Sequence, residues 1–139
     1  MPTLPWTEPN AAEPGAEALV MASRLEVRSL RQVPGFLRAS MSLWRQARRS
    51  PGAWGLGLRA EPLRRTFWTV SAWSGEKAVR AYARAEPHAS TMRRKRTVVR
   101  ESTFVFWNVP AEDLPIEWDE VERRIAAERE RRAAAPAAA

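Results

Sequence analysis

The sequence predicts an α+β fold: a four-stranded antiparallel sheet with helices on one face. Segments with strand alternation and segments with helical periodicity follow one another in the order strand, helix, strand, strand, helix, strand, and a further helix ends the series. Hydrophobic residues make up 45% of the 139 residues, which is enough for one packed core. No internal repeat divides the chain, so we expect one domain over residues 18–132.

The two ends of the chain read differently from the middle. Residues 1–17 are rich in proline, which removes backbone donors and disfavours helix, so we expect an extended arm that is ordered only where it docks. Trp6 is the aromatic residue in this arm that can anchor it. Residues 133–139 are alanine with Pro136, and we expect a disordered tail there.

The first half of the domain predicts strand, helix, strand. Residues 19–28 alternate with a period of two, as a strand does. Pro34 begins a helix in which apolar residues recur at helical spacing, and residues 50–52 (Ser-Pro-Gly) end it. Residues 54–59 form a short strand that contains glycine.

The second half repeats the pattern. Thr66–Trp73 is the strongest strand because most of its residues are β-branched or aromatic. Ser74 is placed as the N-cap of a helix that runs to about residue 85, and Pro87 separates it from a second helical piece. Residues 102–109 form the last strand, with Phe104, Phe106 and Asn108 on one face and Val105 and Trp107 on the other.

This order is that of a ferredoxin-like sheet, which leaves one face uncovered. That face would carry six largely apolar residues, Val20, Ala22, Val70, Ala72, Val105 and Trp107, or the equally apolar alternate set. We therefore predict a homodimer in which two sheets pack face to face. The terminal helix carries only a narrow apolar stripe of Trp118, Val121 and Ile125, which fits a helix lying on a neighbouring surface.

Composition excludes several kinds of site. The chain has no cysteine and a single histidine, His88, so we expect no metal site and no thiol nucleophile. No apolar run approaches the roughly 20 residues that span a bilayer, and the start does not resemble a signal peptide, so we expect a cytoplasmic protein without a membrane partner.

The net charge of +7 raises the question of nucleic-acid binding. The densest basic run is Arg93 to Arg96, and no aromatic platform accompanies it in the sequence. We expect this run to be a solvated helix face rather than a nucleic-acid contact.

The strand Thr66–Trp73, the helix start that contains Glu76, then Tyr82 and the downstream His88 together resemble the antibiotic biosynthesis monooxygenase superfamily. Spheroidene-monooxygenase-like proteins show a similar pattern of strand, Trp, helix and His. The Pro-Gly-Ala-Trp-Gly of residues 51–55 resembles the entry of that family into its second strand, and the likeness covers residues 20–109.

The resemblance implies a dimeric α+β barrel with a pocket between the sheet and the helices of each subunit. The chemistries of the superfamily include cofactor-free oxygenation of polycyclic phenols, haem degradation and polyketide cyclisation. The haem-degrading branch carries Asn in place of Ser23 and Trp in place of Tyr82, and its His falls about ten residues further on, whereas His88 follows Tyr82 by six. These departures disfavour haem, so we expect no cofactor.

Candidate site residues follow from these positions. His88 is the one side chain expected to titrate near neutral pH, so it is the candidate proton acceptor, although a structural helix-start histidine fits the same position. The aromatic candidates for stacking a substrate are Tyr82, Trp73, Trp44 and Trp68, each of which also suits a core. Ser23 and Asn108 are polar residues in apolar strand faces that can orient a substrate oxygen or bond to backbone.

The function that these features predict is a small-molecule enzyme of secondary metabolism. Its substrate would be a flat aromatic or polyketide-derived molecule, and the reaction a cofactor-independent oxygenation or a cyclisation. The alternative that remains open is a dimeric binding or accessory protein that uses the same pocket without catalysis.

Overall fold

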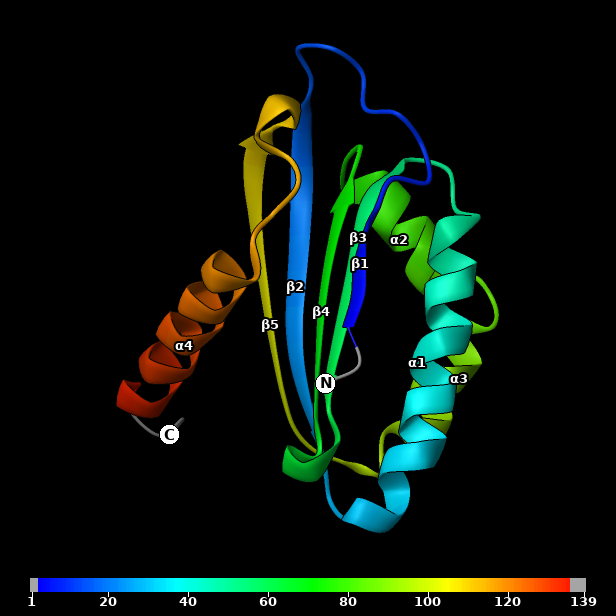
Figure 1. The fold of residues 1–139 in the computed structure, drawn as a ribbon, viewed down its shortest axis with the longest axis vertical. Helices are drawn as coiled ribbons and strands as arrows, with labels where there is room; N and C mark the ends of the chain where they lie inside the picture. Colours follow the sequence, from blue (N-terminus) through cyan, green and yellow to red (C-terminus); the bar gives the residue numbers. More distant parts are fainter. Residues whose placement is uncertain (1–2, 136–139) are drawn as a thin grey trace.

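The computed structural model describes residues 3–135 and contains five strands and four α-helices (Figure 1). The strands are β1 (Thr3–Thr7), β2 (Glu17–Val27), β3 (Ala53–Glu61), β4 (Thr66–Trp73) and β5 (Val99–Pro110). The helices are α1 (Val33–Arg48), α2 (Glu76–Arg84), α3 (His88–Lys95) and α4 (Trp118–Ala134), and short 3₁₀ turns join several of these elements.

The strands form one antiparallel sheet in the order β1-β3-β4-β2-β5. Strands β3, β4, β2 and β5, with helices inserted after the first and third strands of this unit along the chain, have the ferredoxin-like arrangement, so the predicted fold class is confirmed. The sheet has five strands rather than the predicted four, because part of the N-terminal arm pairs with the edge of β3.

Trp6 anchors this arm. A Cβ on Gly55 would overlap the indole ring of Trp6. The ring can therefore dock on β3 only because Gly55 has no side chain. The ring then packs against the buried cluster on the same face of the sheet. Residues 1–2 of the arm lie outside the described residues.

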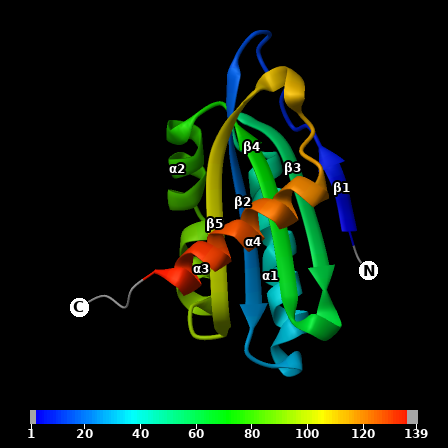
Figure 2. The same cartoon turned by 90° about the vertical axis from the view of Figure 1, so that its left-hand side faces the viewer.

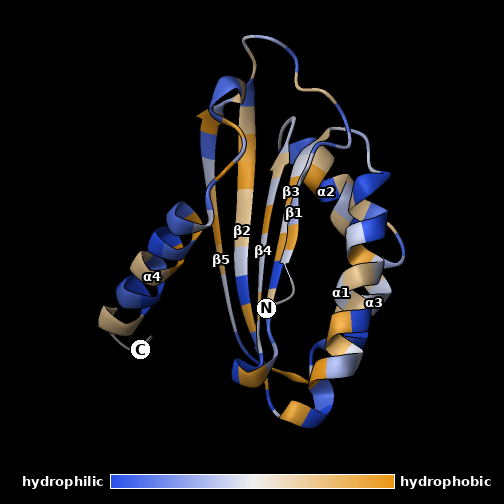
Figure 3. Cartoon of the chain, viewed as in Figure 1, coloured by the Kyte–Doolittle hydropathy of each residue, from blue (hydrophilic) through white to orange (hydrophobic). Residues whose placement is uncertain are grey.

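Three helices cover one face of the sheet and α4 covers the other. Figure 1 shows α1, α2 and α3 on one side and α4 on the opposite side, and Figure 2 shows α4 crossing the strands obliquely. Colouring by hydropathy shows hydrophobic stretches along the strands and a largely hydrophilic α4 (Figure 3). Within residues 3–135, no helix is long and apolar enough to cross a membrane.

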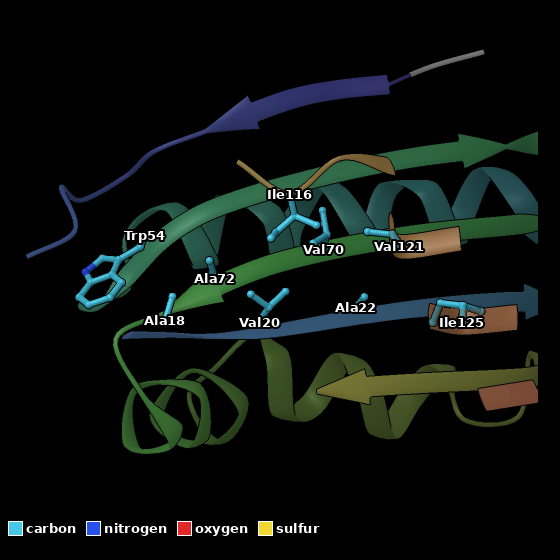
Figure 4. Close-up of a cluster of buried hydrophobic side chains, with 9 residues drawn as sticks. All are labelled: Ala18, Val20, Ala22, Trp54, Val70, Ala72, Ile116, Val121 and Ile125. Carbon is cyan, nitrogen blue, oxygen red and sulfur yellow. The ribbon is translucent and has the colours of Figure 1, made fainter. Parts of the chain in front are cut away.

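The prediction that the second sheet face is uncovered is corrected by α4. Val121 and Ile125 are fully buried against Val20, Val70 and their neighbours, and Figure 4 shows this cluster. The narrow stripe therefore packs on the sheet of its own chain, and the apolar face needs no second copy to cover it. The tail predicted from residue 133 is helical as far as Ala134, and residues 136–139 lie outside the described residues.

The close approach of Trp6 to Gly55 generates a prediction. Gly55→Ala should destabilise the protein by about 1–3 kcal/mol, because the new methyl displaces the indole ring from a packed position. Chemical denaturation measures this difference. In a Trp6→Ala background the same substitution should cost much less, since the overlapping ring is gone.

Gly35→Ala is the matched control. Gly35 lies in α1, where a Cβ meets only ordinary contact with Lys95 Nζ at 3.6 Å, so alanine should be neutral or stabilising there. An equal loss from Gly55→Ala with and without Trp6 would contradict the docking role of this residue.

Candidate functional site

A cavity lies between the sheet and the three helices α1, α2 and α3. Its volume is about 120 Å³. An apolar cavity of roughly 150 Å³ holds one benzene molecule, so this space suits a single aromatic ring. Leu25, Phe36, Leu43, Leu56 and Leu58 give it a largely apolar lining.

Neighbouring strands supply the floor of the cavity. Ser23 on β2 lies directly opposite Thr69 on β4, and Met21 lies opposite Ser71. Because side chains alternate across a strand, residues 69, 71 and 73 all face the helices. Ser23, Thr69, Ser71 and Trp73 all line the cavity.

The three hydroxyls on the floor of the cavity carry more hydrogens than there are protein acceptors to receive them. Ser23 Oγ and Thr69 Oγ1 are 2.5 Å apart, so one of them donates to the other. Ser71 Oγ accepts from Trp73 Nε1 at 2.8 Å. Each hydroxyl carries one hydrogen, so these bonds use only one of the three. Among the described residues no protein acceptor takes the other two, which therefore remain for a ligand oxygen in an apolar cavity.

An aromatic row forms the wall at the α2 side. The rings of Trp73 and Tyr82 lie 5.1 Å apart between centroids, and those of Tyr82 and His88 lie 4.7 Å apart. Trp73 is fully buried, and Trp44 from α1 packs against the same cluster. The sequence alone does not give this order, because His88 comes from a different helix from Tyr82.

Tyr82 is a poor proton donor or acceptor in this wall. Its hydroxyl donates to the carbonyl of Leu43 at 3.2 Å, and burial raises the pKa of its phenol well above the ordinary value of 10. Tyr82 therefore stays protonated and serves as a packing surface.

His88 is held in an orientation that suits a base. Its Nδ1 lies 3.1 Å from the carbonyl of Ala83, and a carbonyl only accepts, so in the neutral ring Nδ1 carries the hydrogen and Nε2 keeps the free lone pair. Burial lowers the pKa of His88 from its ordinary 6.5, and the bond to Ala83 opposes this only in part. His88 is therefore neutral at pH 7.

Gln46 on α1 fixes the backbone around this histidine. Its side-chain oxygen accepts from the backbone N–H of His88 at 2.7 Å, and its amide nitrogen donates to the carbonyl of Tyr82 at 3.0 Å. Both bonds come from one side chain, so α1 determines where α2 ends and α3 begins.

Five of the seven candidate residues meet at the cavity: Ser23, Trp44, Trp73, Tyr82 and His88. Trp68 lies on the α4 face, where its indole nitrogen donates to Glu61 Oε1 at 2.5 Å and the guanidinium of Arg59 lies 5.1 Å from its ring. Asn108 is exposed near the end of β5 and does not line the cavity.

Sequence reasoning missed Thr69, Ser71 and Gln46. Thr69 and Ser71 alternate with Trp68, Val70 and Ala72 within one strand, so their parity with Trp73 would have placed them on the helix face. Gln46 had no such signal, because its role depends on how α1 lies against the junction of α2 and α3.

The four residues of the basic run, Arg93 to Arg96, differ in their exposure. Arg93, Arg94 and Arg96 are exposed, whereas Lys95 is half-buried and lines the cavity. The predicted solvated face therefore describes three of these four residues.

Neither a metal nor a haem is suited to the site. Within residues 3–135, no group of three or more His, Cys, Asp or Glu side chains is arranged to hold a metal ion. A haem has four pyrrole rings, and a space of about 120 Å³ does not enclose it.

No family model matches the chain, and no curated protein matches it in sequence. Solved structures do match. A putative antibiotic biosynthesis monooxygenase from Nitrosomonas europaea has a TM-score of 0.59 at 14% identity, over 70% of this chain and 94% of that one. A single-residue mutant of SnoaB, a cofactor-independent oxygenase from Streptomyces nogalater, has a TM-score of 0.57 at 15% identity, over 71% and 98%.

A putative monooxygenase from Fusobacterium nucleatum has a TM-score of 0.64 at 6% identity, over 73% of this chain, which spans 46% of that protein. The predicted resemblance to the antibiotic biosynthesis monooxygenases is thus confirmed at the level of the fold. At these identities the likeness shows the fold and not the activity.

Burial of His88 predicts a measurable titration. As the only histidine, it gives a single set of ring signals in proton NMR, and its midpoint should lie below 6.5. In the unfolded chain the ring takes up a proton near pH 6.5, while the folded ring does not until lower pH. Its contribution therefore reduces stability as pH falls through 6.5, and adds nothing above it.

His88→Gln is the comparison for stability. This variant should lose that part of the pH dependence in denaturation measured between pH 7 and pH 5. A His88 midpoint at or above 6.5 would contradict the desolvated, neutral histidine.

Proposed function

We propose that this protein is a small-molecule enzyme of secondary metabolism that acts on a flat, hydroxylated aromatic substrate without a cofactor. The observation that carries the proposal is the neutral His88 in an apolar cavity of one-ring size whose floor carries spare hydroxyl donors. A base and donors around one ring are the groups needed to form a phenolate or enolate and hold it.

The size of the cavity limits how the substrate sits. About 120 Å³ takes the reacting ring, and further rings of a polycyclic molecule extend past Phe104, a lining residue that is 43% exposed. The reacting ring then lies beside the row formed by Trp73, Tyr82 and His88.

His88 Nε2 takes the first proton, from a phenolic O–H or from an activated C–H beside a carbonyl. The charge that develops on the substrate oxygen is stabilised by the spare hydroxyl hydrogens of Ser71 and of the Ser23–Thr69 pair. Donors fixed in an apolar site stabilise such charge more than water does, because they need no reorientation.

Oxygenation follows if molecular oxygen is the second reactant. The anion transfers an electron to O₂, and recombination forms a carbon–oxygen bond and a peroxide anion. The imidazolium of His88 returns its proton to the distal oxygen, and loss of water leaves a carbonyl. The sum converts a CH₂ group and O₂ into C=O and H₂O, so His88 ends as it began.

The same base and donors support a cyclisation without oxygen, in which the enolate attacks a second carbonyl of a polyketide-derived chain. A binding protein would use only the cavity and its stacking surfaces. These alternatives are separated by whether oxygen is consumed and whether His88 is needed.

We propose further that two copies associate beside β5. This strand is an edge of the sheet, and Phe104 and Phe106 are exposed on it at 43% and 56%. A second copy there would bury both rings and cover the open side of the cavity. Sedimentation at micromolar concentration should show a dimer, and a stable 15.8 kDa monomer would overturn this association.

The test of the activity is oxygen uptake with a hydroxyanthrone, a polycyclic phenol with an activated CH₂. His88→Ala should lower turnover by about 10²–10⁴-fold, because a general base typically contributes that much. His88→Gln should do no better, since an amide does not take the proton. The two variants should remain folded, which circular dichroism checks.

Ser71→Ala tests the donors within the same assay, and Ser40→Ala is its matched control. Ser40 also lines the cavity, but its hydroxyl donates to the carbonyl of Phe36 at 2.9 Å and is not free for substrate. Ser71→Ala should slow turnover by roughly tenfold or more, since a hydrogen bond to a charged group contributes about 1.5–3 kcal/mol. Full activity in both His88 variants would overturn the enzymatic proposal and leave binding alone.

A further inference from the structure

A second cleft opens on the outer side of the helices and shares only Tyr82 with the cavity already described. It lies between the C-terminal part of α1, the turn at residues 49–52 and α2, and its volume is about 800 Å³. Sites for small organic ligands typically measure about 300–1,000 Å³, so this cleft is large enough for one.

The charge of the cleft is strongly positive. Arg45, Arg49 and Lys77 line it, and Glu86 is its single acidic residue. Within residues 3–135, none of the three cations takes part in an ion pair, although ten ion pairs join other residues. Three unpaired cations around a concave surface that carries a single carboxylate are suited to an anionic ligand.

The nearby acids are occupied elsewhere. Glu86 Oε1 accepts from the backbone N–H of Ser90 at 3.2 Å, and Glu76 is paired with Arg80 on the exposed side of α2. Two carbonyls near the end of α1 are occupied as well. The carbonyl of Gln46 accepts from Ser50 Oγ at 2.9 Å, and that of Ser50 accepts from Asn10 Nδ2 at 3.1 Å. These two carbonyls therefore need no hydrogen bond from either arginine.

The rest of the lining indicates an organic part to the ligand. Ala78, Ala81, Ala85, Pro51 and Pro87 form small apolar walls beside the cations. Arginine suits phosphate because its planar guanidinium can donate two parallel hydrogen bonds. A cationic rim over an apolar wall matches a phosphate ester better than a bare ion.

We propose that this cleft binds a small phosphate ester, with its phosphate at Arg45, Arg49 and Lys77 and its organic part along α2. The site does not depend on the activity proposed above. The cleft is nevertheless next to the proposed base, because Gln46 lines the cleft and also holds the backbone of His88. A ligand in the cleft therefore contacts the side chain that positions His88.

The probes are n-butyl phosphate and inorganic phosphate, titrated by calorimetry at low ionic strength. n-Butyl phosphate should bind, and more tightly than inorganic phosphate, because its chain contacts the apolar wall. The double variant Arg45→Gln/Arg49→Gln should weaken its binding by at least tenfold, and Lys77→Gln should weaken it further when added.

The matched control is Arg38→Gln/Arg48→Gln. Both residues are exposed on α1 and lie outside the cleft, and the control removes the same charge from the same helix. It should leave the affinity within about twofold of the parent chain. Equal losses in the two double variants would show nonspecific attraction and overturn the site, as would the absence of binding by the parent chain.

The contact through Gln46 has its own readout. The single histidine gives assignable ring signals, which should shift when n-butyl phosphate saturates the parent chain and stay in place in Arg45→Gln/Arg49→Gln. Signals that do not move while the parent chain binds the probe would overturn the connection to His88. Neither measurement uses turnover, so failure of the proposed enzyme activity would not affect them.

Discussion

The antiparallel pairing of β2 with β4 is the constraint on which the rest of this structure depends. Its register sets Ser23 against Thr69, and the two-residue period of both strands then fixes every face assignment. Odd-numbered residues of β4 face the helices and supply hydroxyls and an indole to the cavity. Even-numbered residues face α4 and supply apolar side chains to the cluster around Val121 and Ile125. A slip of one residue would exchange the polar floor for the apolar face.

The two faces of the sheet differ in packing: the face under α4 is closed, and the face under α1, α2 and α3 keeps a cavity. The α4 face is closed by apolar burial and by stacked cations, since the guanidinium of Arg59 lies 5.1 Å from the ring of Trp68 and 5.0 Å from that of Trp118. The helix face keeps a small space, because the break between α2 and α3 prevents one continuous helix from filling the groove. A single face thus remains available for chemistry, and the other holds the sheet in shape.

How much of this the sequence predicts depends on whether a residue's role is local. The fold order and the two faces of β5 follow from alternation and helical spacing, and the structure agrees with both. Trp68 does carry a local signal: it differs from Trp73 by five positions in one strand, so the two side chains must face opposite sides of the sheet. The position of α4 had no local signal, because its stripe of Trp118, Val121 and Ile125 fits any apolar surface. Only the length of residues 111–117 and the face they reach decide that it covers its own sheet.

The residues of the candidate site also divide into those whose role the local sequence indicates and those whose role depends on distant contacts. His88 and Tyr82 could be chosen from residue type and neighbourhood, but the state of His88 depends on two hydrogen bonds that no sequence pattern shows. The carbonyl of Ala83 fixes which ring nitrogen is protonated, and Gln46, 42 residues earlier, fixes the backbone. Since one side chain on α1 holds both Tyr82 and His88, any displacement of α1 moves the ring wall and the base together. Tyr82 lines both the cavity and the basic cleft, and Gln46 holds its backbone. Substitution of Gln46 would therefore affect both sites more directly than any change on the sheet.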